Sequence, residues 1–434
     1  MTPPQAILLL NGRIIDPANR VDKKANLLVE KGKIKAVYTA RQESPVLPKR
    51  LMTFDLKGKW IVPGLIDMHV HLREPGEEYK ETIETGTRAA AAGGFTAVAC
   101  MPNTKPVNDS QSVTRFIMEK AEQASARIYP VGAISKGSLG EALAEFGEMK
   151  QAGAVAVTDD GLPVTDSQLM RRALEYASNY NLMVISHSED RSLSRSGTMN
   201  EGFTSTSLGL KGIPHIAEEI MVYRDLALAE YTGRPLHLAH ISTRESLKLI
   251  RHAKQKGVPV TAETAPHYFS LTEKAVNDYN TNAKMNPPLR TDKDLEAVIE
   301  ALGDGTLDAV ATDHAPHSIL EKDIEFDKAA NGIIGLETAV PLALALVRNG
   351  YINETRLVEL LSVNPAKILG VAGGTLGVGA EADVTVIDPE CRFTLHENDI
   401  VSKSKNSPFT NTELQGKALL TICGGRITYN SIGA

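Results

Sequence analysis

Apolar and polar positions follow two different patterns along this chain. Both ends carry short strand-like runs separated by turn residues, such as AILLL near the N-terminus and ADVTVID and ALLTICGG near the C-terminus. The Asn11-Gly12 and Lys31-Gly32 pairs predict hairpin connections between the first runs. Because the two ends of a domain often lie close together, we expect the terminal runs to pair with each other.

The middle of the chain alternates short apolar runs with longer helical stretches, which is typical of βα units around a parallel sheet. Apolar residues recur at helical spacing over residues 112–124 and 245–257, and residues 338–350 form a more uniformly apolar stretch. About eight strand-like runs are present, the number that a closed (β/α)8 barrel needs. They are LIDMHVH, FTAVACM, RIYPVGA, AVAVTDD, LMVISH, PLHLAHI, VPVTAE and LDAVATDH.

These two patterns predict an α/β fold of two parts. Residues 63–364 are expected to form a TIM-type (β/α)8 barrel, and residues 1–62 and 365–434 a small, discontinuous β-sandwich domain. Residues 188–215 are rich in Ser, Gly and Thr and are expected to form a long loop.

Composition excludes several classes of protein. The 434 residues are 42% hydrophobic and 23% charged, with a formal net charge of −6, so neither nucleic acid nor an anionic membrane is an expected partner. No run approaches the roughly 20 apolar residues that cross a bilayer. The three cysteines are widely spaced and form no C-x-x-C pair, so we expect neither a disulfide framework nor a thiolate zinc site. These features favour a cytoplasmic protein.

Histidine and aspartate residues fall at the C-terminal ends of five predicted strands. In a parallel barrel these ends meet at one rim, where active sites of this fold are built. Imidazole and carboxylate are the ligands that zinc uses when it keeps a position open for water. The set exceeds what one tetrahedral ion needs, which indicates two metals sharing a carboxylate. The candidate ligands are His69, His71, Asp159 or Asp160, His187, His240 and Asp313.

Most of the other histidines are expected to be structural or surface residues, and a single histidine at a strand end is more often structural than a ligand. His267, which follows the seventh run, is ambiguous. The structural group is His215, His237, His252, His314 and His396.

Two further side chains are candidates for binding a substrate. Arg73 lies two residues beyond His71, so it can face the same rim, and its guanidinium fits a carboxylate in bidentate fashion. The alternative is a surface salt bridge beside Glu74. Asn103 lies in MPNT, where a Pro-Asn turn is the alternative to a functional role.

Several motifs together resemble the dihydroorotase family of the amidohydrolase superfamily, and in particular its bacterial class I members. The most specific are HVHLREPG at 69–76 and ATDHAPH at 311–317, and the resemblance extends over nearly the whole chain. The others are MPNT, TDDG, SHSE, LAHIST, ETAPHY, MNPPLR, GIIGLET and GTLGVGAEADVTVID.

The resemblance implies a role for each matching residue. His69 and His71 would bind the more buried zinc, and His187 and His240 the second. Asp160 would bridge the two ions; we favour it over Asp159 from its spacing to His187. Asp313 would touch a metal and act as general acid and base. Arg73, Asn103, Asn286 and His317 would bind the substrate.

The implied activity is the reversible hydrolysis of the cyclic amide of L-dihydroorotate to N-carbamoyl-L-aspartate, a step of de novo pyrimidine biosynthesis, through a hydroxide that bridges two zinc ions. The alternatives are another cyclic amidohydrolase, a hydantoinase or allantoinase, and a dihydroorotase-like subunit that supports aspartate transcarbamoylase. The AVAVTDDG strand lacks the bridging lysine of many relatives. Some close relatives carry an aromatic residue where Asn331 stands, which leaves the contacts of that loop open.

The expected partners are a small-molecule substrate and a second copy of the chain in a homodimer. Association with aspartate transcarbamoylase is compatible with activity and remains open. Metal number and identity, oligomeric state and the loop that closes over substrate do not follow from the sequence.

Overall fold

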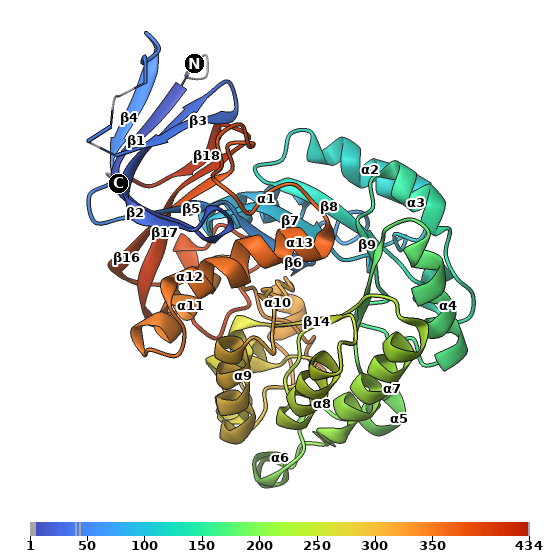
Figure 1. The fold of residues 1–434 in the computed structure, drawn as a ribbon. Helices are drawn as coiled ribbons and strands as arrows, with labels where there is room; N and C mark the ends of the chain where they lie inside the picture. The colour runs from blue at the N-terminus through green and yellow to red at the C-terminus, as the bar shows by residue number, and fades with distance from the viewer. Residues whose placement is uncertain (1–5, 40, 43–44, 433–434) are drawn as a thin grey trace.

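The computed structural model describes residues 6–39, 41–42 and 45–432. Its centre is a parallel sheet of eight strands in the order β15-β14-β13-β10-β9-β8-β7-β6 (Figure 1). A bridge between Val70 and His314 joins the end of the first strand to the segment after the last, so the barrel is nearly closed. All eight predicted runs are confirmed as its strands. They are β6 (Leu65–Val70), β7 (Phe95–Cys100), β8 (Arg127–Gly132), β9 (Ala156–Val157), β10 (Met183–Ser186), β13 (Leu236–Leu238), β14 (Val260–Thr264) and β15 (Ala309–Val310).

Helices surround this sheet, and the three predicted from periodicity are confirmed as α2, α8 and α11. In α8 the residues Leu247, Ile250 and Ala253 are buried, and the Thr243 side chain caps the first turn by accepting from the Ser246 N–H. The principal helices are α1 (Ile83–Ala92), α2 (Gln111–Ala121), α3 (Phe146–Ala152), α4 (Ser167–Ser178), α7 (Ile216–Thr232), α8 (Arg244–Gln255), α9 (Asp292–Asp304) and α11 (Ala339–Arg348). Shorter ones are α5 (Arg191–Ser194), α6 (Phe203–Leu208), α10 (Ile319–Lys322), α12 (Glu354–Val358) and α13 (Asn364–Leu369).

The barrel strands contribute to two hydrophobic clusters. Along β7, Val98 belongs to the large cluster that includes the helices, whereas Ala97 and Ala99 belong to a smaller one with Ala156 of β9 and Ala239 just beyond β13. Because side chains alternate across a strand, the smaller cluster is the barrel interior. Its many alanines leave room for larger polar side chains at the same level.

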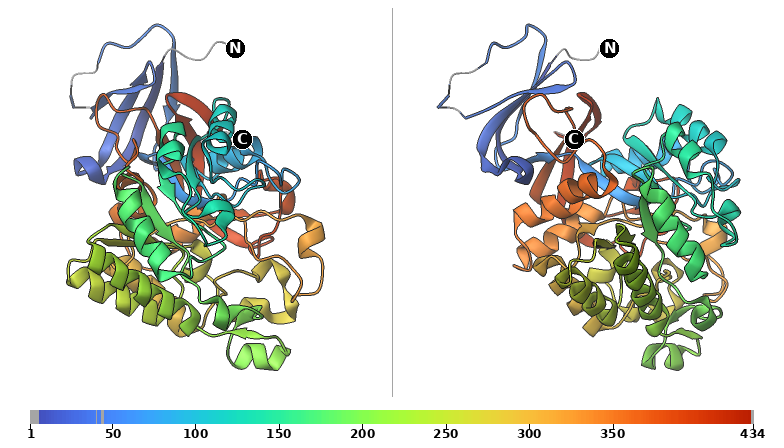
Figure 2. Two further views of the ribbon diagram at one scale, coloured as in Figure 1. Left: turned by 90° about the vertical axis from the view of Figure 1, so that its right-hand side faces the viewer. Right: turned by 45° about the vertical axis from the view of Figure 1, so that its right-hand side comes forward.

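Strands from both chain ends form a separate sheet in the order β18-β17-β16-β5-β1-β2-β3, with β4 beside β1. This confirms the predicted fold class, and Figure 2 shows the sheet beside the barrel. The sheet has its own apolar cluster, which includes Leu9, Val384 and Leu420. The boundaries proposed for the discontinuous domain stay a prediction. The strands are β1 (Ala6–Asp16), β2 (Val21–Glu30), β3 (Lys33–Tyr38), β4 (Leu51–Asp55), β5 (Trp60–Pro63), β16 (Val384–Thr394), β17 (Glu413–Cys423) and β18 (Arg426–Asn430).

One of the two hairpin predictions is wrong. Lys31-Gly32 does connect the antiparallel strands β2 and β3, but Asn11-Gly12 lies inside β1. There the pairing with β2 shifts register, and Asn11 has a left-handed φ of 61°. An Asn-Gly pair suits positive φ in a bulge as well as in a turn, which explains the misassignment.

The segment 188–215 is not the long loop that its composition predicts. It contains α5, α6 and the parallel pair β11 (Met199–Asn200) and β12 (Gly212–Ile213). The guanidinium of Arg290 donates to Asn200 Oδ1 at 2.9 Å and to the Ile213 carbonyl at 3.2 Å. Arg290, about 80 residues further along the chain, therefore holds the segment 188–215 in place. The local sequence pattern of the segment does not reveal this contact. In the part of the chain that is described, no helix is long and apolar enough to cross a membrane.

Candidate metal centre

The candidate ligands meet at the C-terminal rim of the barrel. His69 lies in β6 and His71 just beyond it, while the others follow β9, β10, β13 and β15. They are 1–6% exposed. A cavity of about 280 Å³ opens at this rim. It is lined by every predicted site residue except His69, namely His71, Arg73, Asn103, Asp160, His187, His240, Asn286, Asp313 and His317.

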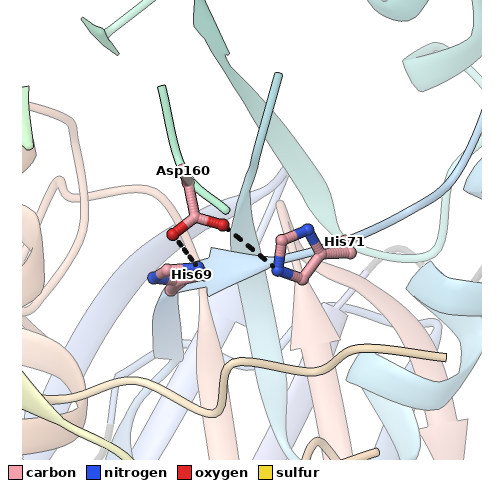
Figure 3. A group of neighbouring side chains, drawn as sticks. All are labelled: His69, His71 and Asp160. Atoms are coloured by element: carbon pink, nitrogen blue, oxygen red, sulfur yellow. Dashed lines mark ion pairs between the residues drawn. The ribbon is translucent and has the colours of Figure 1, made fainter. Parts of the chain in front are cut away.

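Asp160 lies between His69 and His71. Its Oδ1 is 3.3 Å from His69 Nε2 and its Oδ2 is 3.5 Å from His71 Nε2, as Figure 3 shows. The three ligand atoms lie within 4.8 Å of one another, a spacing that can hold a metal ion. We call these residues the first half-site.

Asp160 also belongs to a second group of the same kind. Its Oδ1 is 3.4 Å from His240 Nε2 and 3.6 Å from His187 Nδ1. We call Asp160, His187 and His240 the second half-site. Asp313 Oδ1 lies 3.1 Å from His71 Nε2 and 3.5 Å from His69 Nε2, so it borders the first half-site.

The donor atoms fit metal ions. His69 Nε2 is fully buried and has no hydrogen-bond partner among the described residues, which costs free energy unless a ligand satisfies it. In the second half-site, His187 Nδ1 and His240 Nε2 lie only 2.9 Å apart. Imidazole nitrogens and carboxylate oxygens that converge in this way are the donor set of catalytic zinc.

The charges of the cluster hold its carboxylates ionised. Burial opposes charge on Asp160, but the nearby His69 and hydrogen bonds from His187 and His240 hold its pKa well below the usual range. Burial likewise opposes charge on His187, yet bonds to Asp160 and Glu189 raise its pKa to about 10. Metal cations binding here would take the place of the protons that these groups share.

Asp159 points elsewhere. Its Oδ1 accepts from the Ser135 N–H at 3.0 Å, and its other oxygen accepts from the Ser135 hydroxyl. It therefore fixes the loop that follows β8. Of the two adjacent aspartates, Asp160 is the one that lies among the histidines.

Arg73 is buried beside the cavity without an acidic partner. Its Nε donates to the Pro316 carbonyl at 3.2 Å, and its Nη2 lies 3.3 Å from His317 Nε2. Within residues 6–39, 41–42 and 45–432, no carboxylate lies within ion-pair distance of Arg73. Glu74 pairs instead with Lys120 at 3.2 Å, so the salt bridge considered from the sequence is wrong. A buried cation without a counterion suits an anionic ligand.

Two of the other predicted substrate contacts, Asn103 and Asn286, touch a candidate ligand histidine or its partner. His71 Nδ1 donates to Asn103 Oδ1 at 2.8 Å, and Asn286 Nδ2 donates to Glu189 Oε2 at 3.1 Å. Burial, with Arg73 nearby, lowers the pKa of His317 to about 3, so its ring is neutral. His317 Nε2 lies 2.8 Å from the Asn331 carbonyl.

Three site residues have strained backbone conformations. Arg73, His240 and Asp313 have φ values of 62°, 37° and 49°. Residues other than glycine rarely adopt this left-handed region, and such strain is concentrated at functional sites.

Two acidic residues of this site were not predicted from the sequence. Glu263 lies 3.1 Å from His69 Nδ1, and Glu189 lies 3.0 Å from His187 Nε2. Burial opposes charge on Glu263, but the neighbouring imidazoles of His237 and His69 lower its pKa to about 2. The sequence contains one indication of a role for Glu189, which follows His187 at the two-residue spacing that also relates His69 to His71.

The chain matches known proteins over almost all of its length. A family model described as dihydro-orotase-like matches residues 58–246. A dihydroorotase from Desulfotalea psychrophila is 62% identical over 98% of this chain and 99% of its own, and one from Geobacter metallireducens is 57% identical over the same shares. The chain belongs to the dihydroorotase family. The resemblance seen in the sequence motifs is thereby confirmed.

Solved structures confirm the fold expected of a dihydroorotase family member. The L-hydantoinase of Arthrobacter aurescens superposes with a TM-score of 0.85 at 24% identity, covering 98% of this chain and 96% of that one. A dihydropyrimidinase from Brevibacillus agri gives 0.84 at 22% identity, covering 98% and 95%. At this identity the likeness shows the fold and nothing finer.

Proposed function

We propose that this member of the dihydroorotase family catalyses the reversible hydrolysis of L-dihydroorotate to N-carbamoyl-L-aspartate in de novo pyrimidine biosynthesis. Full-length relatives at 52–62% identity carry the dihydroorotase name. The single structural observation that carries the proposal is the environment of Arg73. Its guanidinium is buried, forms no ion pair within the described part of the chain, and lines the same cavity as the two groups that could hold a metal ion. Both the cyclic amide and its hydrolysis product carry the carboxylate that such a group would bind.

The imidazole and carboxylate donors of both half-sites support binding of zinc. We propose two zinc ions per subunit, held by His69, His71, His187, His240 and the shared Asp160. Such ions supply Lewis acidity, which lowers the pKa of water and polarises a carbonyl group. Metal analysis of the purified protein tests the number and identity of the ions.

The residues around the cavity would perform the remaining steps. In the hydrolytic direction, Asp313 takes the proton of the attacking water and gives it to the ring nitrogen as the C–N bond breaks. Its position beside the first half-site supports both transfers. Arg73 would bind the substrate carboxylate, aided by Asn103, Asn286 and the neutral ring of His317.

The competing functions are less well supported. A hydantoinase or allantoinase has no need of a side-chain clamp for a carboxylate, and a supporting subunit without activity has no need of four convergent histidines. Turnover of L-dihydroorotate, hydantoin and allantoin, assayed side by side, tests the proposal. Turnover of hydantoin or allantoin without turnover of dihydroorotate would overturn it.

Assembly and location are further parts of the proposal. A homodimer is supported by exposed apolar residues along one face of α7, which are Ile216, Ile220, Tyr223 and Tyr231. Sedimentation of the purified protein, alone and mixed with aspartate transcarbamoylase, would test the dimer and the second association. The free cysteines Cys100, Cys391 and Cys423 suit a reducing cytoplasm.

A further inference from the structure

Behind the proposed metal-binding histidines stand two carboxylates, one buried and one half-buried, that no step of the proposed reaction uses. One belongs to Glu263, at 1% exposure in β14. Its Oε1 accepts from His69 Nδ1 at 3.1 Å. Its Oε2 lies 3.2 Å from His237 Nε2, within ion-pair distance but not aligned for a hydrogen bond. His237 is in turn held by Thr261, whose Oγ1 is 2.8 Å from His237 Nδ1.

This contact determines which nitrogen of His69 faces the first half-site. With Nδ1–H donated to Glu263, the bare Nε2 points at Asp160 and Asp313. Carboxylates that accept from the second nitrogen of a metal-binding histidine fix the tautomer and the ring orientation and increase the basicity of the ligand. Glu263 can do this because the alanine-lined barrel interior has room for its side chain and that of His237.

The second carboxylate belongs to Glu189 and stands at the opposite side of the cluster. A single oxygen, Oε2, accepts from His187 Nε2 at 3.0 Å and from Asn286 Nδ2 at 3.1 Å. His187 therefore presents Nδ1 to Asp160. Unlike Glu263, Glu189 contacts a residue that lines the cavity.

The other two histidines lack such support. His71 Nδ1 bonds to the neutral amide of Asn103, and among the described residues the ion pairs of His71 and His240 go only to Asp160 and Asp313. Each half-site therefore has one histidine backed by its own carboxylate.

We propose that Glu263 and Glu189 are positioning residues that set the metal affinity of the two half-sites separately. Glu263 governs the first half-site and Glu189 the second. Through Asn286, Glu189 also links the second half-site to substrate binding. This last part rests on the proposed function, whereas the metal affinities do not.

The test compares Glu263→Gln and Glu189→Gln in the full chain. Glutamine keeps the size and an acceptor oxygen but removes the charge. Zinc affinity is measured by competition with a chromogenic chelator, and the melting temperature is measured with and without chelator. Each variant is expected to bind one of its two zinc ions about 10- to 100-fold more weakly, while the melting temperature of the metal-free protein stays unchanged. Glu337→Gln is the matched control, since Glu337 is a half-buried acid that accepts from the N–H groups of Val401 and Ser402 and is not a member of either half-site.

Combining each variant with His71→Asn identifies which half-site the variant affects. In that background, where the first half-site is already damaged, Glu189→Gln should weaken the remaining zinc and Glu263→Gln should not. If Glu263→Gln does not fold, Glu263→Asp retracts the carboxylate while keeping its charge, and it should also weaken zinc binding.

Four outcomes decide between these possibilities. Wild-type affinity for both ions in both variants would overturn the positioning roles, and equal weakening of both ions by each variant would overturn their separation. An increase in the KM for dihydroorotate in Glu189→Gln, with none in Glu263→Gln, supports the link through Asn286, and equal KM values contradict it. If the wild-type protein does not turn over dihydroorotate but the zinc affinities separate as expected, the proposed function fails and the metal inference stands.

Discussion

Replacing Arg73 by lysine tests the carboxylate clamp while keeping the positive charge. The Pro316 carbonyl occupies Nε of Arg73, which leaves the two Nη groups for a bidentate contact. A lysine presents a single ammonium group, so one of two charge-assisted hydrogen bonds is lost. A bond of this kind contributes about 1.5–3 kcal/mol, which corresponds to about 10- to 100-fold in affinity.

The assay is steady-state hydrolysis of L-dihydroorotate. We expect KM to rise by about one to two orders of magnitude, with a much smaller change in kcat, because the clamp holds substrate and transition state alike. Arg251→Lys is the matched control, since Arg251 is a surface arginine paired with Asp304 at 2.6 Å. A KM for Arg73→Lys within threefold of the wild-type value would refute the clamp.

Three other predictions concern the catalytic base, the metals and a buried lysine. Asp313→Asn should lower kcat by at least about 100-fold while the melting temperature stays near that of the wild type; a near-normal rate would remove the base assignment. Dialysis against a chelator should abolish hydrolysis and lower the melting temperature, and added zinc should restore both; activity that persists in protein shown to be metal-free would contradict the two-zinc proposal. Lys322 donates to the carbonyls of Ala330 and Gly332, and burial lowers its pKa to about 7. The unfolded chain binds this proton more tightly, so the free energy of unfolding of the wild type should rise relative to that of Lys322→Met by about 2 kcal/mol between pH 7 and pH 9. Urea titration at the two pH values measures this change. If the difference between the two proteins stays constant, the lysine titrates normally.

The barrel could be predicted from the sequence because its strands are buried on both faces. Such strands appear as uninterrupted apolar runs, and histidine or aspartate at their ends stands out against that background. The ligand candidates His69, His187 and His240 were visible for this reason. The apolar pattern does not separate Asp159 from Asp160. The spacing to His187 favoured Asp160, and the contact with Ser135 shows where the Asp159 side chain turns.

The features that were missed depend on partners distant in sequence. Glu263 lies inside an ordinary β-strand, and its role becomes visible only when His69, 194 residues earlier, is placed beside it. The short elements within 188–215 are held by Arg290 rather than by their own periodicity. The bulge at Asn11 depends on its pairing with β2, because the same residue pair would also suit a turn.

The pairing of β5 has a consequence for synthesis of the chain on the ribosome. β5 lies between β1 and β16 and leads through Gly64 into β6, the strand that carries His69. During translation one edge of β5 stays open until residues 384–387 have emerged, long after all eight barrel strands have been made. A nascent chain therefore possesses every candidate metal ligand before it can complete the sheet that anchors the first of them.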